Sequence, residues 1–163
     1  MMQTTDRRTR LFWIGLPLMV GLLLPSLVLF AVQVVVGGVA WSAALADVLA
    51  RQFATGHNLF LIAVLGLLPF VMLAVVSVIA ARRLPARRLS CFAAGGLAAI
   101  LAMTVPGQVG VWAPFYGGGQ VSSTAPIAFV ILPVFGVVAL AVGLLGGWLI
   151  SCLPVFRAGN TGD

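Results

Sequence analysis

The stretch LFWIGLPLMVGLLLPSLVLFAVQVVV, from Leu11 to Val36, holds 26 residues without a charged side chain or a histidine. As a helix it would be about 39 Å long, which exceeds the roughly 30 Å hydrocarbon core of a bilayer. Charged residues and histidine are also absent from three more long apolar runs: Leu59–Ala81, Leu89–Val105 and Pro126–Leu153. A spanning backbone must satisfy its hydrogen bonds internally, and the alternation of a barrel strand is missing. We therefore predict an all-α polytopic integral membrane protein with four transmembrane helices.

The composition agrees with this fold class and excludes most kinds of functional site. Only 7% of the 163 residues are charged, against about 25% in an average soluble protein. The net charge of +6 comes from arginines that form no basic stripe interleaved with aromatic residues, so we expect no nucleic-acid partner. His57 is the single imidazole. With only Cys91 and Cys152 beside it, the chain cannot form a bis-His haem or four-ligand zinc site, and we expect no cofactor and no metal.

The arginines predict the orientation of the chain. An even number of spans leaves Arg51 alone on one side and puts eight arginines on the other: Arg7, Arg8, Arg10, Arg82, Arg83, Arg87, Arg88 and Arg157. Because arginine concentrates in cytoplasmic loops, we predict that both termini, the loop 82–88 and the tail 154–163 are cytoplasmic. Arginine without lysine, together with abundant Ala and Gly, is typical of GC-rich bacterial coding. The expected location is therefore the cell inner membrane.

A signal peptide is the alternative interpretation of the N-terminus. The arginines before the first apolar run and the later Ala44-Leu45-Ala46 loosely fit such a segment. The apolar run is much longer than the roughly 7–15 residues of a signal h-region. We therefore expect one membrane domain over residues 1–163 that keeps its first span.

Two segments are predicted on the outer side. Residues 41–53 carry Asp47 and Arg51 as an i,i+4 pair, and another face holds apolar residues at helical spacing: Trp41, Leu45, Val48, Leu49 and Phe53. This pattern is typical of a short amphipathic helix lying along the interface. Residues 107–124 are rich in glycine and carry Trp112, Phe115 and Tyr116. We predict a flexible, uncharged loop there.

Small residues form a stripe on the fourth span and another on the third. Ala139, Gly143, Gly147 and Ser151 recur every four residues, and so do Ser90, Ala94, Ala98 and Ala102, with Gly95 and Ala99 beside them. Such stripes let two helix backbones approach closely where lipid supplies no hydrophobic driving force. The two spans therefore either pack on each other, or one stripe faces another protein or a second copy of the chain.

Few polar groups lie within the predicted spans. The deepest are Gln33, Ser77 and Thr104, and Gln33 is the one suited to strong hydrogen bonding across helices. Prolines inside three spans free backbone carbonyls: Pro17, Pro25, Pro69 and Pro133. Because the sequence shows no polar partner beside them, we interpret these prolines as kinks rather than as an ion site.

Because the sequence lacks most catalytic residue combinations, it favours a binding function. The leading hypothesis is a non-catalytic accessory or immunity-type protein, which binds a larger membrane complex or neutralises an envelope-acting toxin. Its expected contact residues are Trp112, Phe115, Tyr116 and the span-four stripe. An oligomeric channel with Gln33 lining an uncharged path is the alternative. A membrane enzyme using Asp47 and His57 is disfavoured, because no nucleophile, metal ligand or second carboxylate lies nearby. Expected partners are membrane lipid and a protein or second copy.

Overall fold

The computed structural model describes residues 7–54, 58–120 and 125–152, and this part of the chain is almost entirely helical. Its elements are α1 (Arg7–Val35), α2 (Trp41–Ala50), η1 (Arg51–Phe53), α3 (Leu59–Gly66), α4 (Leu68–Ala80), α5 (Ala86–Tyr116) and α6 (Ala125–Ser151). The all-helical prediction is confirmed for these residues. Three helices are long and apolar enough to cross a membrane, and the number rises to four if α3 and α4 form one bent span.

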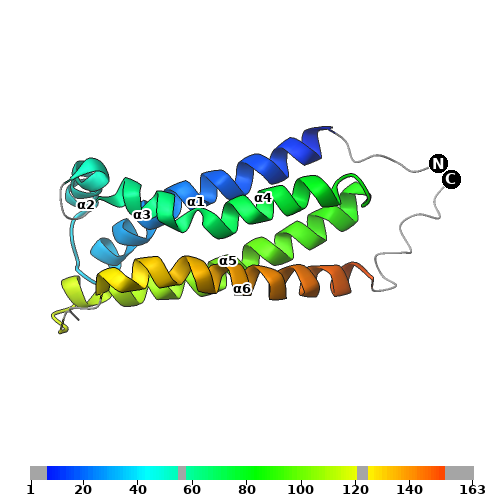
Figure 1. Ribbon diagram of the computed structural model, residues 1–163. Coiled ribbons are helices and arrows are strands. Elements are labelled where there is room, and N and C mark those ends of the chain that lie inside the picture. Colours follow the sequence, from blue (N-terminus) through cyan, green and yellow to red (C-terminus); the bar gives the residue numbers. More distant parts are fainter. Residues whose placement is uncertain (1–6, 55–57, 121–124, 153–163) are drawn as a thin grey trace.

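The long helices lie side by side in a bundle (Figure 1). α1 begins, α4 meets α5, and α6 ends at the same end of the bundle, whereas α2 lies at the opposite end. We call the end that carries α2 the α2 end. The arginines at the start of α1 and around the α4–α5 connection therefore share one end, and Arg51 lies at the other.

The expected second span is broken rather than continuous. α3 ends at Gly66, α4 starts at Leu68, and the two helices are bent by 40°. The cause is Pro69, which has no N–H to give to the carbonyl of Leu65. At the break the N–H of Leu67 instead donates to Val64 at 3.3 Å, in a tighter turn than the α-helical one.

α5 and α6 pack against each other through small residues. A Cβ added to Gly147 would lie 2.5 Å from the carbonyl oxygen of Cys91, and one added to Gly95 would lie 2.9 Å from the Cα of Gly147. Gly143 likewise lies against Gly95 and Ala99. The interpretation that these two spans pack on each other is therefore correct. On α5, however, the contact row is Cys91, Gly95 and Ala99, while Ala94, Ala98 and Ala102 are exposed.

The prediction of a loop over residues 107–124 is wrong for its first ten residues. α5 continues to Tyr116 as a helix of 31 residues, about 46 Å long. Gly107, Gly110 and Pro114 suggested a loop, but the chain stays helical at all three, and the buried side of the helix continues past them. That side includes Ile100, Thr104, Gln108 and Trp112, spaced four residues apart. Tertiary packing of this face outweighs the weak helix propensity of glycine.

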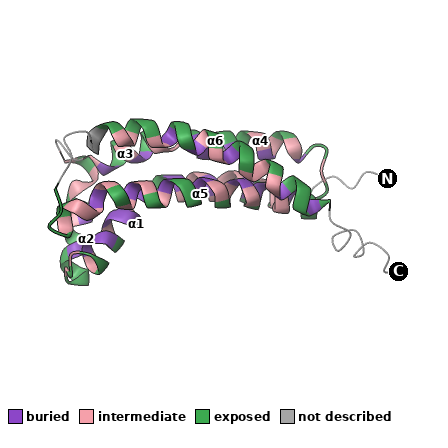
Figure 2. Ribbon diagram, turned by 90° about the horizontal axis from the view of Figure 1, so that it is seen from below, coloured by how far each residue is buried: buried purple, intermediate pink, exposed green. Residues whose placement is uncertain are grey.

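Buried residues follow the faces on which the helices meet, and the outward faces are exposed (Figure 2). Those outward faces are apolar: Val142 and Leu145 of α6 are both 64% exposed. A water-soluble bundle would carry charged side chains at such positions. The apolar exterior and the long apolar helices are compatible with a protein surrounded by lipid.

Candidate functional site

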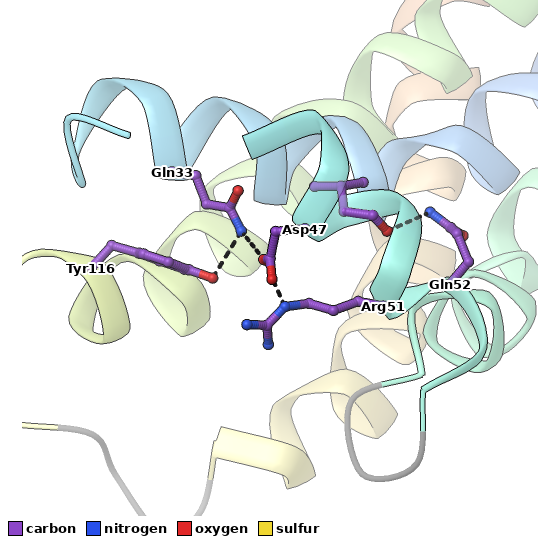
Figure 3. Close-up of polar contacts among 6 residues, drawn as sticks. Gln33, Asp47, Arg51, Gln52 and Tyr116 are labelled. Carbon is purple, nitrogen blue, oxygen red and sulfur yellow. Dashed lines mark hydrogen bonds and ion pairs between the residues drawn. The ribbon is translucent and has the colours of Figure 1, made fainter. Parts of the chain in front are cut away.

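A cluster of four polar side chains, each from a different helical element, lies at the α2 end. Gln33 comes from the last turns of α1, Asp47 from α2, Arg51 from the start of η1 and Tyr116 from the last residue of α5 (Figure 3). We call these residues the polar cluster. The first and last of them are 83 residues apart in the sequence. The cluster therefore fixes the relative positions of α1, α2 and α5.

Gln33 is the centre of the polar cluster. Its side chain is buried, with 1% of its surface exposed. The amide nitrogen has two N–H groups. It donates one hydrogen bond to Oδ2 of Asp47 at 2.6 Å and one to the hydroxyl oxygen of Tyr116 at 2.9 Å. Both donors are thus used, and the expectation that Gln33 bonds across helices holds.

The charges in the cluster stabilise each other. Arg51 Nε lies 2.7 Å from Asp47 Oδ2, so the expected i,i+4 ion pair is present. Burial acts to raise the pKa of Asp47, but the hydrogen bonds from Arg51 and Gln33 and the charge of Arg51 outweigh it and lower that pKa. The hydrogen bond to Asp47 in turn raises the pKa of Arg51. Both groups are therefore ionised at neutral pH.

Local backbone structure brings α2 back over the end of α1. Gly38 has φ +60°, a left-handed conformation that glycine adopts without strain, and it lies in the short connection between the two helices. The N–H of Val39 donates to the backbone carbonyl of Gln33 at 3.0 Å. A side-chain contact holds η1, which follows α2 directly: Gln52 Nε2 donates to Ser26 Oγ at 2.8 Å. The segment formed by α2 and η1 is thus attached to α1 at two levels.

The predicted aromatic contact residues lie in three different environments. Trp112 is buried, with 2% exposed, and its ring packs against Phe129 of α6 at a centroid distance of 5.5 Å. Tyr116 is half-buried in the polar cluster. Phe115 is exposed. The expectation that all three project from a flexible outer loop is therefore wrong, because α5 is helical at each of them.

The remaining predicted contact residues, those of the span-four stripe, contact other residues of the same chain. Gly143 and Gly147 of the span-four stripe face α5. Ser151 is buried and donates to the carbonyl oxygen of Trp148 at 2.7 Å, and Ala139 is half-buried. Close packing on α5 already covers the centre of the stripe, so it is not a free face for a partner.

Of the two residues in the catalytic alternative, the structure describes only Asp47. Asp47 accepts hydrogen bonds from both Gln33 and Arg51. His57, its proposed partner, lies outside the described residues. Within the described ranges, no three His, Cys, Asp or Glu side chains come together in a way that could hold a metal ion.

Two features of this region were not predicted from the sequence. One is the bond between Gln33 and Tyr116, and the other is the inward position of Gln108, which the loop prediction had placed outside the bundle. The four-residue spacing of Ile100, Thr104, Gln108 and Trp112 is the signal that could have extended the helix. No protein-family model matches this chain, and neither a curated protein nor a solved structure is significantly similar to it.

Proposed function

We propose that this chain is a non-catalytic accessory or immunity-type protein of the inner membrane, which binds a larger membrane protein through α2 and η1. The supporting observation is the outward face of these two elements. Trp41 and Phe53 are 71% and 74% exposed, and Leu45 and Leu49 lie exposed between them. Contiguous exposed apolar residues of this kind are typical of protein or membrane contacts.

The polar cluster supports the same proposal from the inner side of α2. Asp47 accepts a hydrogen bond from Gln33 of α1, and Ala44 and Val48 of α2 are buried, so the helix is attached by a side that is partly polar and partly apolar. Val48, which was predicted on the apolar face, belongs to this inward side. A surface held in this way is already in its binding conformation. Binding then requires little loss of conformational entropy.

The proposed orientation has the arginine-bearing end in the cytoplasm and α2 on the outer side, because positive residues concentrate on the cytoplasmic side of membrane proteins. Single cysteines test it in a variant without Cys91 and Cys152. Both Ala46 on α2 and Arg83 are exposed. A membrane-impermeant maleimide applied to intact cells should label the Ala46→Cys protein and spare the Arg83→Cys protein. The reverse labelling would overturn the orientation.

Photo-crosslinking from matched positions tests the binding function. A photoreactive residue at Leu49 of α2 should give a discrete protein adduct in native membranes. The same residue at Val142 of α6 should give lipid adducts only, although the two positions are equally exposed, at 62% and 64%. The protein adduct should weaken when Gln33→Glu loosens α2. Lipid adducts alone from both positions would contradict a protein partner.

A further inference from the structure

A small cavity, partly open to the outside, lies where five helices of the bundle meet. α1, α3, α4, α5 and α6 contribute to its wall, and the polar side chains in that wall are Thr104 and Gln108. The space open to the centre of a water molecule is about 10 Å³. One water molecule needs roughly 10–15 Å³ by this measure, so the cavity is the size of a single water.

Gln108 indicates that the cavity holds an occupant that donates hydrogen bonds. Its side chain is 5% exposed, and among the described residues no donor reaches its Oε1 atom. Thr104 donates its own proton to the carbonyl oxygen of Ile100 at 2.7 Å, so it has none left for Gln108. A buried amide oxygen without a donor is costly, and lipid supplies no donor.

Two prolines add further acceptors to the same wall. Pro25 of α1 and Pro133 of α6 have no N–H, so the carbonyl oxygens of Gly21 and Phe129 lose the donor that a continuous helix would provide. All four residues line the cavity. Residues with freed carbonyl oxygens on α1 and α6 thus line the same small space as Gln108 of α5.

We propose that this cavity binds one water molecule, which donates to Gln108 Oε1 and to a carbonyl oxygen freed by Pro25 or Pro133. Such a water replaces the backbone donor that the proline lacks and joins α5 to a kinked neighbour. The residues that line the cavity carry no charge. An unpaired cation there would lose its hydration without a counter-charge, which makes a neutral donor the fitting ligand.

Solid-state NMR of the full chain in lipid bilayers tests the proposal, with magnetisation transferred from water protons to labelled Gln, Gly and Leu. Transfer should reach the Gln108 side chain and the Cα of Gly21 at mixing times when Leu29 receives none. Leu29 is the dry control, because it is fully buried and does not line the cavity. If Gln108 and Gly21 receive no more magnetisation from water than Leu29 does, the proposal is wrong, and no result with a substituted chain would restore it.

Gln108→Met keeps the length of the side chain and removes the acceptor. We expect loss of the transfer to Gly21 in this variant, whereas unchanged transfer would overturn the role of Gln108.

Thermal unfolding in sodium, potassium and choline chloride at equal ionic strength tests whether the cavity holds a cation instead of water. The midpoint temperatures of unfolding in the three salts should coincide. A higher midpoint in sodium or potassium that disappears in Gln108→Met would assign the cavity to a cation and overturn the proposal.

Discussion

The α5–α6 interface and the polar cluster hold helices together by different means. Between α5 and α6 the contact is backbone to backbone, with Gly147 against Cys91 and Phe92. At the α2 end the contact is made by long polar side chains that meet at Gln33. The first interface depends on the absence of side-chain atoms, and the second depends on a few atoms of defined chemistry.

This difference predicts how each region responds to substitution. Close backbone packing collects many weak dispersion contacts, and all of them are lost together when the helices separate. The polar cluster has few contacts, each sensitive to whether a group donates or accepts a hydrogen bond. Volume should therefore control stability at α5–α6, and donor–acceptor pattern should control it at the α2 end.

The largest effect is expected at Gly147. Gly147→Ala puts a methyl group 2.5 Å from the carbonyl oxygen of Cys91, which forces α5 and α6 apart. We expect a loss of about 2 kcal/mol in the free energy of unfolding. Gly146→Ala is the matched control, because its methyl group would meet no atom within 4 Å. Unfolding in detergent, followed by circular dichroism, measures both. Equal stability of the two variants would contradict close packing.

Gln33→Glu tests the donor pattern at nearly constant volume. Glutamate has no N–H to donate and brings a second carboxylate to Asp47, so we expect a loss of about 1.5 kcal/mol. Adding Asp47→Asn restores a donor opposite the introduced carboxylate and should recover part of the loss. The double-mutant cycle measures this coupling. Independent effects of the two substitutions would show that Gln33 and Asp47 do not interact.

Acid should weaken the polar cluster and spare the glycine interface. The pKa of Asp47 is lower in the folded chain than in the unfolded one. The unfolded state therefore binds more protons, and stability rises with pH in this range. The contribution of Asp47 is complete above the ordinary Asp pKa of about 4 and is lost as the pH falls through the folded value. Thermal unfolding from pH 6 to 3 should show this loss in the native chain but not in Asp47→Asn.

Tyr116→Phe should have the smallest effect. It removes one neutral acceptor from Gln33 and leaves the bond to Asp47 in place. We expect a loss of about 0.5–1 kcal/mol in the free energy of unfolding. Combined with Gln33→Leu, it should cost nothing further, because leucine neither donates a hydrogen bond to the Tyr116 hydroxyl nor accepts one from it. An additive loss would place the role of Tyr116 in packing rather than in the polar cluster.

The sequence was most informative where local pattern decides structure. The apolar runs indicated the helices, and the spacing of Gly143 and Gly147 indicated close packing on either the third span or a partner, of which the structure shows the first. It was misleading at Gly107 to Tyr116, where glycine and proline suggested a loop. There the buried positions Gln108 and Trp112 continue the inward face of α5. Helix propensity is a local property, whereas burial of that face depends on α1 and α6.

The sequence by itself determined the helical class, the apolar exterior and the Asp47–Arg51 pair, because hydropathy and i,i+4 spacing act between near neighbours. Only the tertiary structure decided that Gln33 meets Tyr116, that Gln108 lines a cavity between helices, and that Asp47 of α2 bonds to α1. Each of these contacts joins residues from different helices. Their positions depend on how the helices pack and bend, which no local pattern in the chain specifies.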